Sequence, residues 1–396
     1  MRLVFLVAAA TLLCGAPLVC DEAGAGVREV AVGGRLMWDY LAWGDVESDL
    51  GLVADDGTEV RRARLCASGK VYERLKFKVE WDFADCDEVC LKDGYLELID
   101  VPPGGSIRVG HMHEPFCMNE LTSSKYITFM ERASLTAFAP SRNSGLTYVG
   151  NAGGRSRWEL GVFATTDESG SASGALGASL SGRISFIAAG EAESDRLLHV
   201  GGAVNYLAPE GDEIRFSARP EVHMSGRLVD TGELMARDVL RLGAEVGAVF
   251  GPAHFAGEYV AAIVSGPDDS LSASVEGSEY EAALSGYYVQ AGYFLTGESR
   301  TYKAGKWGRV APRGDFLADG GSGAVELAVR YSSLDLNDGD SGIVGGALQD
   351  VTVGLNWYLH ANARLMLNQV WATARDAEDG KIGSATATMM RLQFDF

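Results

Sequence analysis

The segment from Leu75 to Phe83 reads LKFKVEWDF, in which apolar and charged side chains alternate without a break. Because the side chains of a β-strand point alternately to its two faces, this segment has one apolar face and one charged face. The same alternation recurs along the chain and reaches its last residues, RLQFDF, where Phe394 and Phe396 share the apolar face. Repetition of this pattern to the end of the chain predicts a closed β-barrel with lipid outside and water inside.

The apolar residues are too dispersed to form helices that cross a membrane. Hydrophobic residues make up 47 % of the 396 residues, yet the mean hydropathy is only +0.02. A spanning helix needs about 20 consecutive apolar residues, and beyond the N-terminus Gly, Ser, Asp or Arg interrupts the apolar runs every few residues. Fifty glycines and ten prolines fit many strands and tight turns. We therefore expect an all-β, antiparallel, up-and-down transmembrane barrel.

The first 25 residues are predicted to be a secretory signal peptide. Arg2 supplies a positive charge, and residues 3–13 form an apolar run that is too short to span a bilayer. Ala23-Gly24-Ala25 offers a small-residue cleavage site, and cleavage after Cys20 is the alternative. Residues 26–396 would then form a single exported barrel domain.

Export would place the four remaining cysteines in an oxidising compartment, where disulfides persist. Cys86 and Cys90 lie on either side of a predicted turn, close enough in the chain for a disulfide to close it. A bond between Cys66 and Cys117 is a further pairing, and the sequence alone leaves the connectivity open.

Other short motifs carry little weight. His111, His113 and Cys117 could suggest a metal site, but no second ligand pair follows at a suitable spacing. Residues 339–342 spell GDSG, but the chain contains no histidine block of the kind that a serine protease triad requires. The tripeptide RGD at residues 313–315 falls in a predicted loop. We expect neither an enzyme nor a bound metal or cofactor.

The net charge of the chain is −20, with 54 acidic and 34 basic residues. Nucleic acids attract basic surfaces, so the balance argues against a nucleic-acid partner. The acidic residues concentrate in predicted loops, such as residues 191–195, 210–213 and 335–340. The net charge therefore describes the loops better than the lumen of the barrel.

Seventeen segments qualify as candidate strands on this pattern, among them Glu213–Gly226. Bacterial single-chain barrels have even strand numbers, so we expect sixteen strands in the wall. Residues 113–142 are too long and too mixed in character for a turn. Long loops of this kind are often functional, and we expect this one to fold into the lumen.

Several blocks of the sequence occur in the order of a known family. They are RRARL at 61–65, FKVEWDFA at 77–84, LKDGYLEL at 91–98, HEPFCMNELTSSKYITFMERA at 113–133, PSRNSGL at 140–146, YYVQAGYFLTGE at 287–298, GAVELAVRYSSLDL at 323–336 and GLNWYLHANARLMLNQV at 354–370. This ordered set resembles the phosphate-selective porin O and P family. The resemblance implies a sixteen-stranded barrel in the outer membrane of a Gram-negative-type bacterium. It also implies a homotrimer, surrounded by outer-membrane lipid, that passes small ions such as phosphate by diffusion.

The resemblance also points to individual residues. Arg61 and Arg62 match the paired arginines of the family, Asp93 matches the acid of its KD block, and Lys125 is the candidate cation of a constriction loop. Strict alternation would place only one of Arg61 and Arg62 in the lumen unless a β-bulge intervenes. The alternation pattern itself adds further inward-facing cations, namely Arg64, Lys76, Lys78, Arg215, Arg219, Arg241, Arg330 and Arg391.

Two functions stay open at this point. A passive channel would use its arginines and lysines to favour anions, because rings of cations do so in pores and a guanidinium matches the oxygens of phosphate. A structural or adhesive outer-membrane barrel would have little channel activity. Acidic residues predicted on the same inward face could pair with the cations and neutralise them; these are Glu80, Asp82, Asp93, Glu97, Glu159, Glu221 and Glu245.

Overall fold

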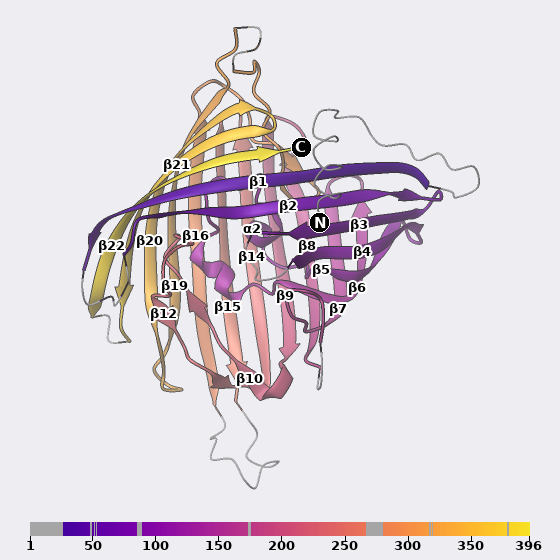
Figure 1. Cartoon of the computed structure of the whole chain (residues 1–396). Coiled ribbons are helices and arrows are strands. Elements are labelled where there is room, and N and C mark those ends of the chain that lie inside the picture. Colours follow the sequence, from indigo (N-terminus) through magenta and orange to yellow (C-terminus); the bar gives the residue numbers. More distant parts are fainter. Residues whose placement is uncertain are drawn as a thin grey trace.

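Sixteen antiparallel strands close into one barrel (Figure 1). The computed structural model describes residues 27–47, 50, 52, 54–84, 89–172, 176–266, 280–316, 318, 320–377 and 380–396, so the predicted signal peptide lies outside the described residues. The wall consists, in order, of β1 (Val27–Val46), β2 (Gly57–Val71), β3 (Leu75–Asp82), β4 (Cys90–Val101), β5 (Gly105–His113), β6 (Arg142–Ala152), β7 (Ser156–Ala164), β8 (Ala178–Gly190), β9 (Arg196–Ala208), β14 (Asp238–Phe250), β15 (Ala253–Ser265), β16 (Glu281–Phe294), β19 (Ala324–Asp338), β20 (Ile343–His360), β21 (Ala363–Arg375) and β22 (Lys381–Asp395). The expected fold class and strand number are both confirmed.

The barrel closes where the first strand meets the last. In Figure 1 indigo β1 lies beside yellow β22, and the two pair in antiparallel register, with Leu36 opposite Phe394. Gly34 donates its backbone N–H to the carbonyl of Phe396 at 3.1 Å. A Cβ on Gly34 would lie 2.6 Å from the carbonyl oxygen of Arg64, so this close approach requires glycine. Every wall strand therefore pairs on both sides, which removes the exposed strand edges that promote aggregation.

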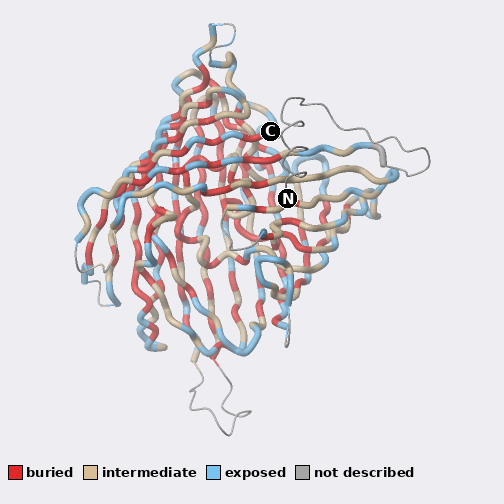
Figure 2. Tube along the Cα trace, in the orientation of Figure 1, coloured by how far each residue is buried: buried red, intermediate tan, exposed pale blue. Residues whose placement is uncertain are grey.

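Burial alternates along the wall strands (Figure 2). On β20, Val351, Val353 and Leu355 are exposed on the outer face, whereas Thr352 and Asn356 on the inner face are fully buried. A soluble protein would bury the apolar side chains and expose the polar ones. The reversed arrangement places apolar side chains where lipid would surround them and polar side chains inside the barrel, as the alternation predicted.

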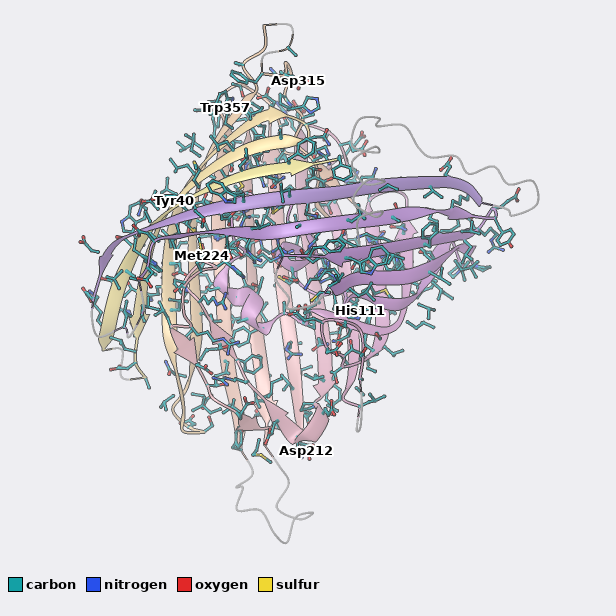
Figure 3. All side chains as sticks on the ribbon, in the orientation of Figure 1. Tyr40, His111, Asp212, Met224, Asp315 and Trp357 are labelled. Carbon is teal, nitrogen blue, oxygen red and sulfur yellow. The ribbon has the colours of Figure 1, made fainter. Side chains whose placement is uncertain are left out.

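The connections between wall strands divide between two ends of the barrel. The turn end holds the short connections 72–74, 102–104, 153–155, 191–195, 251–252 and 361–362, together with the longer connection 295–323. The loop end holds the connections 47–56, 83–89, 114–141, 165–177, 209–237, 266–280, 339–342 and 376–380. Figure 3 shows Asp212 and Asp315 at these opposite ends. None of the helices in the described residues is long and apolar enough to cross a membrane.

Among the connections in the described part of the chain, three fold into the barrel. The eyelet segment (114–141) contains α2 (Met118–Leu121) and η2 (Ser134–Phe138). The mouth segment (209–237) contains η3 (Glu210–Asp212) and two small hairpins, in which β10 (Glu213–Ile214) pairs with β13 (Leu234–Met235) and β11 (Ser217–Ala218) pairs with β12 (Val229–Asp230). The turn-end segment (295–323) contains the hairpin of β17 (Tyr302–Lys303) and β18 (Lys306–Trp307). The inward fold of residues 113–142 was expected from the sequence, and that of the turn-end segment was not.

Of the seventeen candidate strands, Glu213–Gly226 is the one that does not belong to the wall, so the expectation that its Arg215 and Arg219 face the lumen from a wall strand was wrong. It belongs to the mouth segment, where Phe216 and Val222 are buried and Arg215 and Arg219 are exposed. A segment that lies between the inner wall and a wet lumen has one dry face and one wet face. Its sequence therefore alternates as a wall strand does, which is why the pattern could not separate the two.

Glycines of the wall make room for the inserted segments. A Cβ built on each of four inner-wall glycines would lie only 3.0–3.2 Å from a side chain of an inserted segment. The pairs are Gly243 with Phe116, Gly286 with Leu135, Gly354 with Phe129, and Gly247 with Trp307. The large apolar side chains of the eyelet and turn-end segments thus pack directly on the backbone of the wall.

Candidate functional site

Two adjoining cavities lie inside the barrel. The mouth cavity, of about 400 Å³, is lined by residues of the eyelet and mouth segments. The central cavity, of about 180 Å³, extends from the eyelet segment to Lys306 of the turn-end segment. Arg62, Glu120 and Arg132 line both cavities and mark their junction. The two cavities therefore lie along one candidate route, from the eyelet and mouth segments to Lys306 of the turn-end segment.

Cations dominate the lining of this route, although the chain as a whole is acidic. Ten arginines and lysines line the central cavity, namely Arg35, Arg62, Arg64, Lys78, Arg108, Arg132, Arg142, Arg157, Arg183 and Lys306. The four acidic residues that line it are Glu80, Asp93, Glu120 and Glu159. In the mouth cavity five arginines (Arg61, Arg62, Arg132, Arg219 and Arg227) face three glutamates (Glu120, Glu131 and Glu221). The excess of positive charge inside opposes the net charge of −20 for the whole chain.

A β-bulge brings both Arg61 and Arg62 to the lumen. The register of β1 with β2 runs from Met37 opposite Arg62 to Trp38 opposite Val60, which leaves Arg61 as the extra residue. Arg61 donates to Glu131 at 2.9 and 3.0 Å. Arg62 is nearly buried but makes no hydrogen bond or ion pair with the described residues, and its Nε is without a partner. Its donors are therefore available at the junction of the two cavities.

Several other lining cations are already paired with carboxylates. Arg64 contacts Glu80 at 3.0 Å and Asp82 at 2.6 Å. Lys78 contacts Asp93, whose other oxygen accepts a hydrogen bond from Arg142 at 2.8 Å. These side chains line the central cavity, but a passing anion would have to compete with their carboxylates.

The eyelet segment is fixed to the wall through its backbone. Glu258 of β15 accepts hydrogen bonds from the backbone N–H groups of Met118 and Asn119, both at 2.7 Å. Asn356 of β20 donates to the carbonyl of Thr128 at 2.8 Å. Because side chains from distant wall strands form hydrogen bonds with its backbone N–H and C=O groups, the segment has a defined position across the lumen.

Arg132 is the cation that the eyelet segment presents at the junction. It forms an ion pair with Glu120 at 3.0 Å and donates to the carbonyls of Asn119, Glu120 and Thr122 at 2.9–3.0 Å. In the same segment Glu131 pairs with Arg61 and with Arg391 at 2.8 Å. Burial alone would raise the pKa of Glu131, but the charges of Arg61 and Arg391 lower it well below its usual value. Glu131 therefore remains a carboxylate and offsets part of the positive charge of the mouth cavity.

Lys306 completes the central cavity from the opposite side. It belongs to the turn-end segment, which is anchored inside the barrel by a hydrogen bond from Arg183 to the carbonyl of Gly305 at 2.6 Å and by a contact of Tyr302 with His199 at 2.7 Å. Burial lowers the pKa of Lys306 to about 8. Its charge is thus sensitive to pH near neutrality.

Other residues predicted to line the pore lie outside both cavities. Arg391 pairs with Asp39, Arg330 pairs with Glu221, and Arg241 donates to Asn205 while it packs over the ring of Phe216. These three arginines are buried at the boundary between the wall and the inserted segments. They hold those segments in place. The sequence did not reveal this role, because strand alternation predicts which residues face inward but not which inserted segment covers them.

Three further predicted cations also lie away from the two cavities, for separate reasons. Lys76 is exposed near the turn 72–74, and Arg215 is exposed on the mouth segment beside Asp230 at 2.5 Å. Lys125 lies 3.5 Å from Asp395 and lines a third, small cavity near the turn end. Arg219 does line the mouth cavity, where it donates to the carbonyl of His223 at 2.6 Å.

The sequence analysis did not select some of the cations that line the cavities, although strand alternation marks a few of them as inward-facing. Arg35 and Arg108 follow the same strand alternation as Arg64, so a stricter reading of β1 and β5 would have found them. Arg132 and Lys306 lie in irregular segments where no periodicity applies. Only the path of the inserted chain brings these two side chains to the cavity.

The cysteines and histidines bear on the alternatives that the sequence left open. Cys66 and Cys117 are free thiols, so the pairing left open between them is not formed. Cys90 is disulfide-bonded, whereas Cys86 lies outside the described residues. Within the described ranges, no three His, Cys, Asp or Glu side chains are grouped as metal ligands would be, which leaves the alternative at His111 and His113 without support.

Known proteins provide an independent comparison. A curated uncharacterised protein of Caulobacter vibrioides is 31 % identical over 366 residues, which cover 87 % of this chain and 68 % of that protein. Porin O of Pseudomonas aeruginosa is 25 % identical over 407 residues, covering 92 % of this chain and 88 % of that protein. Both matches run along most of the barrel.

Solved structures share the fold at low sequence identity. An anion-selective porin from Comamonas acidovorans aligns with a TM-score of 0.56 and 13 % identity, over 93 % of this chain and 99 % of that one. The trimer form of OmpT, an outer-membrane protein of Vibrio cholerae, aligns with a TM-score of 0.55 and 14 % identity over the same shares. The family model described as phosphate-selective porin O and P matches residues 30–396. The chain belongs to this family, and it is an outer-membrane channel of the porin type.

Proposed function

We propose that this porin is a passive channel that prefers small anions, inorganic phosphate among them. The observation that carries the proposal is the lining of the central cavity, where ten cations face four acids in a chain that is acidic overall. Rings of Arg and Lys favour anions in pores because they replace part of the hydration that the ion loses. We assign no enzymatic step to the protein.

Arg62 is the proposed central contact. It lies at the junction of the two cavities, and it makes no hydrogen bond or ion pair with the described residues. A guanidinium keeps its charge at all relevant pH values and presents a planar set of donors that fits phosphate oxygens. Arg132 on the eyelet segment supplies a second positive charge at the same level, partly offset by Glu120.

The proposed path has a direction through the membrane. In porin-type barrels the short turns face the periplasm and the longer loops face outward. An anion would enter through the mouth cavity, pass Arg62 and Arg132, and leave along Lys306. Ion pairs such as that of Lys78 with Asp93 weaken several lining cations, so successive binding is weak enough for the anion to leave.

We also propose that the channel is a homotrimer in outer-membrane lipid. The support is the fold shared with OmpT of Vibrio cholerae, whose structure is of a trimer. The anion preference has parallel support from the shared fold of an anion-selective porin and from the name of the family.

Planar-bilayer recordings test the proposal. In a KCl gradient the reversal potential should show chloride preference, and added phosphate should reduce the chloride current. Arg62→Ala should shift the reversal potential toward cations. Arg215→Ala removes the same charge from an exposed position outside both cavities and is the matched control.

Three outcomes would count against the proposal. A cation-selective wild type would refute the anion preference, and equal shifts in both variants would refute the central role of Arg62. Purified protein that gave no conductance steps would favour the alternative of a structural or adhesive barrel.

A further inference from the structure

A third cavity lies near the turn end, apart from the proposed route of permeation. Its volume is about 10 Å³, and it shares no lining residue with the mouth or central cavity. Three regions that are distant in sequence meet there: the eyelet segment at Lys125 and Tyr126, the turn-end segment at Arg300 and Arg309, and the wall near Arg364. A cavity of this size holds a single water molecule or monatomic ion.

Positive charge is in excess around this cavity. The described residues of its lining include Lys125, Arg300, Arg309 and Arg364 but no carboxylate. Behind the lining, Asp395 contacts Lys125 at 3.5 Å and also pairs with Arg309. The nearest acid to Arg300 is Glu326, at 3.8 Å. Arg364 has no carboxylate within ion-pair distance among the described residues, so four cations face two acids.

The oxygens of Glu326 are occupied by other partners. One accepts a hydrogen bond from His254 at 2.6 Å, and the other accepts from Asn356 at 2.8 Å and from Tyr358 at 2.7 Å. Glu326 therefore offers Arg300 only a long contact. Within the described ranges, the acidic side chains that contact these four cations do not balance their positive charge.

Two guanidinium groups at the cavity also have unsatisfied donors. Arg300 and Arg364 are 1 % and 2 % exposed, and neither Nε has a hydrogen-bond partner among the described residues. Their remaining donors are bound to neutral oxygens, with Arg364 bonded to Ile127 O and to Gln393 Oε1, both at 2.8 Å. A buried charged group without full pairing is costly, and a small anion at this point would supply both the charge and the acceptor.

We propose that this cavity binds one small inorganic anion, chloride in ordinary salt solutions, between Arg300 and Arg364. Phosphate is too large for a cavity that holds a single water-sized sphere. The bound anion would stabilise the eyelet segment, because Arg300 and Arg364 donate to the carbonyls of Tyr126 and Ile127. The site is structural and does not depend on the ion preference of the pore.

Anomalous diffraction from crystals of the purified channel in sodium bromide tests the site directly. We expect a bromide peak between the side chains of Arg300 and Arg364, and the same position should hold chloride in crystals grown in sodium chloride. A water molecule at this position in the bromide crystals, or density that fits only phosphate, would overturn the proposal.

Thermal unfolding of the purified channel gives an independent readout. At equal ionic strength the wild-type midpoint should be higher in sodium chloride than in sodium gluconate, because a ligand that binds only the folded state stabilises it. Arg364→Met should lose this difference, whereas Arg215→Met should keep it, since Arg215 is exposed on the mouth segment and lines none of the three cavities. If Arg364→Met does not fold, Arg300→Lys, which keeps the charge but removes the guanidinium donors, should also lose the difference. An equal chloride effect in wild type and both site variants would refute the role of this cavity.

Discussion

Among the contacts that hold the mouth segment inside the barrel, the buried carboxylate of Glu221 accepts hydrogen bonds from two wall strands. It is 4 % exposed and receives hydrogen bonds from Arg330 of β19 at 2.9 Å, from Thr352 of β20 at 2.6 Å, and from Ser332. Arg330 is itself 2 % exposed. The substitution Glu221→Gln would remove the carboxylate that pairs directly with this buried guanidinium.

The size of the effect follows from the burial of both partners. Breaking a buried ion pair by removing one partner costs about 3–5 kcal/mol, which corresponds to a factor of about 10² to 10⁴ in an equilibrium constant. We therefore expect the population of barrels with a released mouth segment to rise by this factor in Glu221→Gln. The wall itself should stay intact, because its strands pair independently of this segment.

Limited trypsin digestion measures the released population. When opening and closing are fast, the cleavage rate follows the fraction of open molecules, so cleavage after Arg227 should accelerate by the same factor until every molecule is open. Single-channel recordings should show a larger or noisier conductance, since the released segment no longer narrows the mouth cavity. Circular dichroism before digestion would verify that the variant still forms the barrel.

Asp230→Asn is the matched control within the same segment. It removes the exposed pair of Asp230 with Arg215, which solvent screens, so its cleavage rate should stay near that of the wild type. The reasoning fails if Glu221→Gln is cleaved at the wild-type rate, or if both variants are cleaved equally fast.

Two further predictions concern the eyelet and the turn-end segment. Gly354→Val should displace Phe129, whose ring would lie 3.1 Å from the new Cβ, and should destabilise the fold by about 1–3 kcal/mol. We expect a changed single-channel conductance and a lower unfolding midpoint. Gly339→Val is the control, and it should alter neither because there is open space around Gly339. Raising the pH from 7 to 9 should remove the charge of Lys306, whose pKa is about 8, and so lower the ratio of anion to cation permeability. This pH dependence should be absent in Lys306→Met, and a retained dependence would assign it to another group.

The wall of the barrel could be read from the sequence because each strand obeys a local rule. A residue such as Leu355 faces outward and its neighbour Asn356 inward because the side-chain period of a strand is two, whatever its partners are. From the sequence, both Arg61 and Arg62 could face the lumen only if a β-bulge interrupted the strand. The structure contains this bulge.

The alternation of apolar and charged residues by itself indicated the barrel and the face of most wall residues, because these depend on contacts that every strand makes locally with lipid and lumen. The expected strand number also needed the rule that such barrels have even numbers of strands, and strict alternation fails at the bulge beside Arg61. Only the tertiary structure decided which inward cations reach the cavities. Arg330 and Arg62 follow the same pattern in the sequence, yet Glu221 of a distant segment covers Arg330 and nothing in the described residues pairs with Arg62. That difference comes from the path of the inserted segments, which depends on long-range packing against the wall, and strand periodicity carries no information about it.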